Sequence, residues 1–172
     1  MSEQAFTIRR ADRRDLPALG RLGALLLRTH HGFDAHRFMA PGDRPEQGYA
    51  WFLGTQLERD DVVILVAERQ DRVLGYAFAG IEPQSWKELR DEAGFIHDVI
   101  VDPEVRGSGM GRALVDAAVR WLAGRGMARV VLWTASRNTG AHRLFGRLGF
   151  RDTMIEMTRE VPQEGRVGPP EE

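Results

Sequence analysis

Three glycines, Gly107, Gly109 and Gly111, fall within the six residues RGSGMG, between an apolar run and a helical pattern. Glycine destabilises a helix by roughly 0.5–1 kcal/mol relative to alanine, so three of them at a helix start need a separate reason. A stretch without side chains leaves backbone N–H groups free to meet an anion at the positive end of the helix dipole. The chemistry that this spacing predicts is the binding of a phosphate or pyrophosphate group.

Spacing separates the kinds of phosphate-binding loop. The dinucleotide fingerprint needs a glycine at position 112 and an acidic residue about 20 positions further on, but the sequence has Arg112 and the apolar run 130–132 there. A P-loop needs a lysine and then a hydroxyl residue after its last glycine, and GSGMGRAL has neither. A turn that uses glycine only for packing accounts poorly for three of them. The pattern that remains is R-x-x-G-x-G, formed by Arg106, Gly109 and Gly111.

The elements around the loop predict an α/β fold. Apolar runs predict strands and helical periodicity predicts helices; the strands are expected at 6–9, 62–68, 73–81, 95–101, 129–134 and 150–160, and the helices at 15–31, 46–58, 110–122 and 138–148. The second and third strands form a hairpin, whereas strand–helix–strand order favours parallel pairing. We therefore expect a mixed sheet with helices on both faces. One domain is expected at 1–160, followed by a disordered, Pro- and Gly-rich tail at 161–172.

Composition excludes several classes of function. The 172 residues carry a formal net charge of −1 and no cysteine, which argues against nucleic acid as the main ligand and removes thiol catalysis and Cys-ligated zinc. No apolar segment is long enough to span a membrane, and no signal peptide is evident, so a cytoplasmic protein is expected. Three histidines and an aspartate cluster at His30, His31, His36 and Asp34 without a repeated ligand spacing, so no metal site is expected.

Two segments resemble a known family. DVIVDPEVRGSGMGRALV is similar to the strand, acetyl-CoA loop and helix of the GCN5-related N-acetyltransferases (GNAT superfamily). NTGAHRLFGRLGF resembles the family's N-x-x-A-x-x-(F/Y)-x-x-x-G-F segment, with Asn138, Ala141, Gly149 and Phe150 in place. The resemblance is strong over 95–152 and more diffuse to about 160. Two motifs in the right order are much more specific than one glycine loop.

The resemblance implies acetyl-CoA as cosubstrate and a set of residues that bind it. The backbone of the loop would hold the pyrophosphate, with two arginines adding positive charge, and the pantetheine arm would run along the strand before the loop. The implied contacts are Arg106, Gly107, Ser108, Gly109, Met110, Gly111 and Arg112 in the loop, Val99 and Val101 in the strand, and Asn138 and Phe145 in the second motif. Asn138 is equally well placed to cap its own helix.

The resemblance also implies direct attack of an amine on the thioester, and the amine must lose a proton. In the polyamine-acetylating branch of the family, an acidic residue lies on the strand just before the loop; here His97 occupies that position with Asp98 beside it. Histidine titrates near neutral pH and can act as a base. Both residues have alternatives, because His97 can be a hydrogen-bonded structural histidine and Asp98 a structural contact. Strand alternation predicts that His97 shares a face with Val99 and that Asp98 lies on the opposite face.

One position departs from the family pattern. Many relatives have a tyrosine that protonates the departing thiolate, and this sequence has Phe145, which has no proton to donate. Water, Thr134 or Ser136 could serve instead. The departure also raises an alternative function, a non-catalytic module on the same fold that binds acyl-CoA.

The acceptor site is expected among the first two helices, their loop and the connector before the fourth strand. Candidate substrate contacts are Phe38, Glu82 and Trp86. Acidic residues there either attract a cationic amine or form a solvated connector. The predicted function is transfer of an acetyl group to a primary amine of a small molecule or peptide. A dinucleotide-dependent oxidoreductase is the third hypothesis. The sequence does not define the oligomeric state; the resemblance allows a homodimer, because relatives are often dimers.

Overall fold

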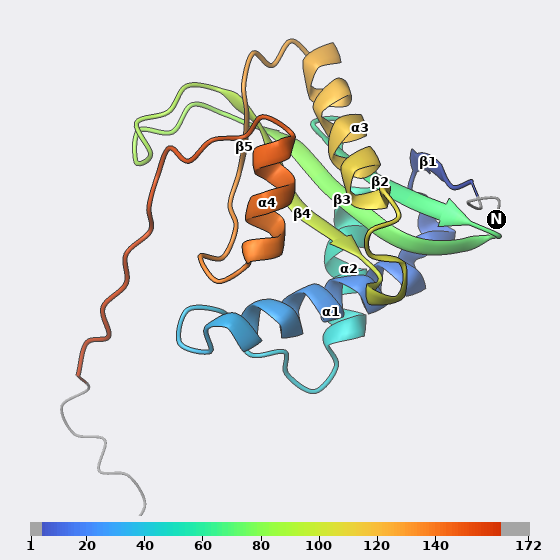
Figure 1. Cartoon of the computed structure of the whole chain (residues 1–172), viewed down its shortest axis with the longest axis horizontal. Coiled ribbons are helices and arrows are strands. Elements are labelled where there is room, and N and C mark those ends of the chain that lie inside the picture. Colours follow the sequence, from blue (N-terminus) through green and yellow to red (C-terminus); the bar gives the residue numbers. More distant parts are fainter. Residues whose placement is uncertain (1–4, 163–172) are drawn as a thin grey trace, which may run out of the picture.

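The computed structural model of the chain describes residues 5–162. The strands are β1 Thr7–Arg10, β2 Val62–Arg69, β3 Arg72–Glu82, β4 Ala93–Val101 and β5 Val130–Leu132, and the helices are α1 Leu16–Phe33, α2 Pro45–Gln56, α3 Met110–Gly124 and α4 Thr139–Arg147. The sheet has the order β1-β2-β3-β4-β5, antiparallel except for the parallel pair β4–β5. The predicted mixed α/β sheet with helices on both faces is confirmed (Figure 1).

The sheet separates two apolar cores. Alternate residues of β2 point to opposite faces, so Val63 and Leu65 pack toward α3 whereas Ile64 and Val66 pack toward α1. Both faces of β2 and β3 are buried, which explains their nearly continuous apolar sequences. Among the described helices, none is long and apolar enough to cross a membrane.

Two glycines of α1 let α2 approach closely. A Cβ added at Gly20 would lie 2.4 Å from the backbone oxygen of Glu46, and one at Gly23 would lie 2.0 Å from the ring of Tyr49. Larger residues would push α2 away from α1. The two glycines therefore determine the position of Tyr49 above the sheet, where its hydroxyl lies 3.3 Å from Asp98 Oδ2.

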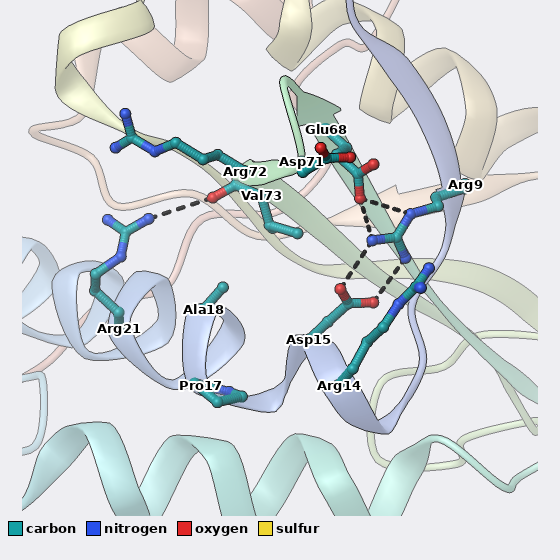
Figure 2. A pocket seen from close by; sticks show the side chains of 10 residues that line it. All are labelled: Arg9, Arg14, Asp15, Pro17, Ala18, Arg21, Glu68, Asp71, Arg72 and Val73. Carbon is teal, nitrogen blue, oxygen red and sulfur yellow. Dashed lines mark hydrogen bonds and ion pairs between the residues drawn. The ribbon is translucent and has the colours of Figure 1, made fainter.

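A buried ion-pair cluster joins β1, β2 and the start of α1. Arg9 donates to both carboxylate oxygens of Asp15, at 2.7 and 2.9 Å, and also to Glu68 (Figure 2). Asp15 is only 4% exposed, and the Arg9 guanidinium holds the pKa of its carboxyl below the ordinary value. A pocket of about 540 Å³ adjoins the cluster. Arg9, Asp15 and Glu68 of its lining form the cluster itself, and Arg21 donates to the Val73 carbonyl and to Asp102.

The predicted strand at 150–160 is wrong. Residues 150–162 form no strand, and after α4 the chain leaves the sheet (Figure 1). Met154, Ile155 and Met157 are 79%, 84% and 90% exposed. The apolar pattern indicates that the segment favours an extended conformation. A strand also needs a neighbouring strand to pair with, and within the described chain this segment has none. The predicted disordered tail lies outside the described residues from 163 onward.

Candidate active site

The glycine loop connects the end of β4 to the start of α3. A short 3-10 helix, Pro103–Val105, begins it, and Asp102 fixes its start by accepting from the Glu104 amide at 3.2 Å and from Arg21 Nη1 at 2.8 Å. Gly107 and Gly109 have φ of +81° and +83°, in the left-handed region that favours glycine. A Cβ added at either would meet nothing within 4 Å. The space in front of the loop is therefore open.

Several hydrogen-bond donors at this loop have no acceptor within the described chain. The amide of Ala113 is the first to bond within α3, to the Gly109 carbonyl at 3.0 Å, so the amides of 110–112 have no intrahelical partner. Within the described chain, the hydroxyl of Ser108 is buried and also without a partner. Arg106 and Arg112 lie exposed beside them. This set of orphaned donors fits a pyrophosphate, as the sequence predicts.

The gap between β4 and β5 provides a second unpaired edge. The two strands pair only from Gly94 to Ile96, whereas β4 continues to Val101. The Asp102 amide donates to the Leu74 carbonyl at 2.7 Å, and N–H groups alternate between the two edges of a strand. Val99 and Val101 therefore direct their backbone groups away from β3, toward the gap, where an extended pantetheine arm can pair with them.

A β-bulge lies where β4 and β5 separate. Phe78 of β3 pairs with Asp98 and the next residue, Ala79, pairs with Ile96, so His97 is the extra residue. The bulge overturns the predicted alternation. Instead of pointing to opposite faces, His97 contacts Phe78 and Asp98 contacts Tyr76, both on the face covered by α1 and α2, whereas Val99 packs on the α3 face.

His97 is held between aromatic rings. Its ring lies 4.8 Å from that of Phe78 and 5.8 Å from that of Phe95, and its side chain is 28% exposed. The Nε2 atom lies 3.3 Å from Glu82 Oε1. Burial lowers the pKa of His97 below 6.5, and the charge of Glu82 opposes this shift. The imidazole is therefore neutral at pH 7 and able to accept a proton.

Asp98 is engaged by two tyrosines. Tyr76 donates its hydroxyl to Oδ2 at 2.8 Å, and Tyr49 donates to the same oxygen at 3.3 Å. Burial raises the pKa of Asp98, and the two hydroxyl donors oppose the shift. Burial also raises the pKa of Tyr49 and Tyr76, so both remain donors. With both hydroxyls on one oxygen, Asp98 links α2 to the bulge and shapes the position of His97.

A pocket of about 470 Å³ opens at His97. Its walls come from α2, the end of β3 and the start of β2; they include Phe52, Arg59, Asp61, Phe78, Ile81 and Glu82. Of the predicted substrate contacts, the structure brings Glu82 to this pocket. Trp86 lies on the β3–β4 connection, is 82% exposed and does not line the pocket. Phe38 lies in the α1–α2 loop, where its ring contacts His30.

The second motif has clear structural roles. Asn138 caps α4, with Oδ1 accepting from the Ala141 amide at 3.1 Å. Phe145 packs against Phe150, with ring centroids 5.8 Å apart, and against the α3-side core. Thr134, just after β5, carries a buried hydroxyl without a partner in the described chain. These contacts leave any role of Asn138 and Phe145 toward a cosubstrate as a prediction.

The sequence did not identify the four aromatic residues near the pocket at His97, which forms the acceptor side of the site. Tyr49, Phe52, Tyr76 and Phe78 looked like ordinary core positions in apolar runs. Tyr76 and Phe78 do alternate along β3, but no local signal shows which residues of α2 will face them. These side chains come close to His97 and Asp98 only through tertiary contacts between segments that are distant in the sequence.

Comparisons with known proteins place the chain among acetyltransferases. The model of the acetyltransferase (GNAT) family matches residues 28–150. An uncharacterized N-acetyltransferase of Methanocaldococcus jannaschii is 29% identical over 88% of this chain and 63% of that protein. A mycothiol acetyltransferase of Cellulomonas flavigena is 34% identical over 80% of this chain and 38% of that protein. The chain thus spans less than two thirds of the length of these relatives.

A solved structure has the same fold. An aminoglycoside N-acetyltransferase in complex with CoA superposes with a TM-score of 0.71 at 20% identity, over 91% of this chain and 95% of that chain. At this identity the likeness concerns the arrangement of strands and helices.

Proposed function

Because the chain belongs to the acetyltransferase (GNAT) family, we propose that it transfers the acetyl group of acetyl-CoA to a primary amine of a small molecule or peptide. GNAT acetyltransferases use acetyl-CoA. The observation that carries the proposal is the loop at the start of α3, where unpaired amides, the unpartnered Ser108 hydroxyl and two arginines surround open space.

The donor side, formed by the loop 106–112 and the end of β4, binds acetyl-CoA and polarises its thioester carbonyl. The unpaired backbone amides of Gly107 and of residues 110–112 hold the pyrophosphate, assisted by the positive end of α3. Backbone groups of Val99 and Val101 hold the pantetheine arm in the gap beside β4. The bound cosubstrate supplies an activated thioester. One of these two amides donates to the thioester carbonyl oxygen, where it stabilises the negative charge that develops during attack.

The acceptor side supplies the base. A lysine-like amine of pKa about 10.4 is neutral only about once in 2,500 molecules at pH 7, a cost near 4.6 kcal/mol. When neutral His97 donates Nε2–H to Glu82, its Nδ1 is left as the proton acceptor. The amine nitrogen then forms a bond to the carbonyl carbon, the carbon–sulfur bond breaks, and His97 takes the amine proton, directly or through water.

The phenylalanine at position 145 is the reason to consider a second function, a module that binds acyl-CoA without catalysis. A phenyl ring replaces the tyrosine expected as proton donor to the thiolate, so a module that binds acyl-CoA without transferring the acetyl group is the second candidate. A thiolate can leave without a side-chain acid, and this favours catalysis. The two candidates differ in outcome, because only the enzyme consumes acetyl-CoA when an amine is present.

Two copies of the chain are also proposed to associate. The exposed segment with Met154, Ile155 and Met157, together with the edge strand β5, supports this proposal. A backbone edge without a partner accepts a strand from another chain. Light scattering should give a dimer for the full chain and a monomer for Ile155→Lys; a monomeric parent protein at all concentrations would exclude it.

The test of the proposed function combines binding with turnover. Acetyl-CoA should raise the thermal unfolding midpoint, whereas NAD(P) should not, and thiol release should depend on an added amine. Binding without thiol release across a broad panel of amines would favour the non-catalytic module. Stabilisation by NAD(P) in place of acetyl-CoA would favour an oxidoreductase.

A further inference from the structure

We propose that the pocket at His97 takes a primary monoamine carried on a compact apolar body, with an arylalkylamine as the best fit. This inference rests on the proposed function and specifies the acceptor. The pocket volume of about 470 Å³ lies within the range of small-molecule sites, about 300–1,000 Å³.

The pocket wall is aromatic and aliphatic. Phe52 and Phe78 meet edge to face at 5.9 Å, and the Phe78 ring continues to His97 at 4.8 Å. Val62, which packs on the same face of the sheet as Phe78, completes this surface. Phe52 remains 38% exposed, so part of its ring is available to a ligand. An aromatic ring of the acceptor would find offset or edge-on partners along this row.

The charges in the pocket select one positive group. Arg59 is neutralised by Asp61, to which it donates at 3.0 and 2.6 Å, and it also donates to Gln56 at 3.0 Å. Glu82 then remains as the pocket carboxylate that, within the described chain, forms no ion pair with an arginine; its Oε1 lies 3.3 Å from His97 Nε2. An ammonium group that lies beside Glu82 and within reach of His97 Nδ1 is attracted by the carboxylate and deprotonated by the imidazole.

The same charges disfavour other amines. A second ammonium group at the far end of a polyamine would gain little, because the other pocket carboxylate, Asp61, is already paired with Arg59. A carboxylate next to the amine, as in a free amino acid, would lie beside Glu82 and be repelled. The pocket thus recognises a single charge at one end and apolar surface along its length.

The experiment compares amines at saturating acetyl-CoA. We expect kcat/KM for 2-phenylethylamine to exceed that for spermidine and for glycine by about tenfold or more. Phe52→Ala should raise KM for 2-phenylethylamine about tenfold, and Phe52→Leu should restore part of it. The matched control is Trp51→Ala, which removes the neighbouring ring on α2; Trp51 is 73% exposed and outside the pocket, and its loss should change KM less than twofold.

The outcomes separate the inference from the function on which it rests. Acetyl transfer with spermidine or glycine preferred would overturn the inference and leave the acetyltransferase standing. An equal KM in Phe52→Ala and the parent protein would also overturn it, provided that acetyl-CoA binding by calorimetry shows the variant to be folded. Acetyl-CoA binding with no transfer to any amine would overturn the proposed function and the inference together.

Discussion

The donor side and the acceptor side of the site are built in different ways. On the donor side, one continuous segment from β4 through Gly107 and Gly109 to α3 carries most of the expected contacts. On the acceptor side, α2, β2, β3 and β4 each contribute a wall of one pocket. The donor side can therefore be recognised from local sequence, whereas the acceptor side exists only after the chain has folded.

The largest expected effect is on the donor side. Gly109→Asp places a carboxylate where we propose that the pyrophosphate binds, and like charges in contact cost several kcal/mol, so acetyl-CoA affinity should fall by about 100-fold or more. Gly126→Asp is the matched control, because Gly126 also has a positive φ, +85°, and open space at its Cβ, but follows the other end of α3. Calorimetric titration of both variants checks this, and equal affinities would refute the loop assignment.

The next effect separates chemistry from binding. His97→Gln removes the proposed base and should lower kcat by about 100-fold or more, while the dissociation constant of acetyl-CoA stays the same. His36→Gln changes an exposed histidine in the α1–α2 loop and should leave kcat unchanged. A His97→Gln variant with the kcat of the parent protein would remove His97 from the mechanism.

The pH dependence of kcat/KM gives a second test of His97. Because burial lowers the pKa of His97 below 6.5, the imidazole stays neutral until the pH falls below that value. The acid limb of kcat/KM should therefore lie below pH 6.5 in the parent protein. Glu82→Gln removes the charge that raises this pKa, so the acid limb should move to still lower pH and the acceptor KM should rise about tenfold.

A control for that prediction lies on the β3–β4 connection. Glu88 pairs with Arg90 at 2.9 Å, outside the pocket. Glu88→Gln should change neither the acid limb nor the acceptor KM. An acid limb that moves to higher pH in Glu82→Gln would mean that Glu82 does not act on His97 through its charge.

The smallest effect concerns an exposed charge of the donor side. Arg112 is exposed and pairs with Asp116 at 3.5 Å, so Arg112→Gln should weaken acetyl-CoA binding about threefold at low salt, and less at high salt. Arg120→Gln, two turns further along α3, should have no effect. A loss of 100-fold in Arg112→Gln would show that this side chain, and not the backbone, dominates pyrophosphate binding.

The sequence was sufficient for the mixed sheet with its β2–β3 hairpin and for the place of the glycine loop between a strand and a helix, because apolar periodicity and glycine spacing are local properties. It failed at His97, because strand alternation assumes an uninterrupted ladder and the bulge inserts one extra residue. Tyr49 and Tyr76 are 49 and 22 residues from Asp98 along the chain, so no local pattern could pair them. The final strand failed for the same reason, since a partner edge is a property of the fold.

The most direct test of the central claim is to measure CoA release and N-acetylated amine in the same reaction mixture, with the amine identified by mass spectrometry. We predict that the two products form in equal amounts and that neither forms in Gly109→Asp. CoA release without the acetylated amine, or acetyl-CoA binding with no product at all, would contradict the account.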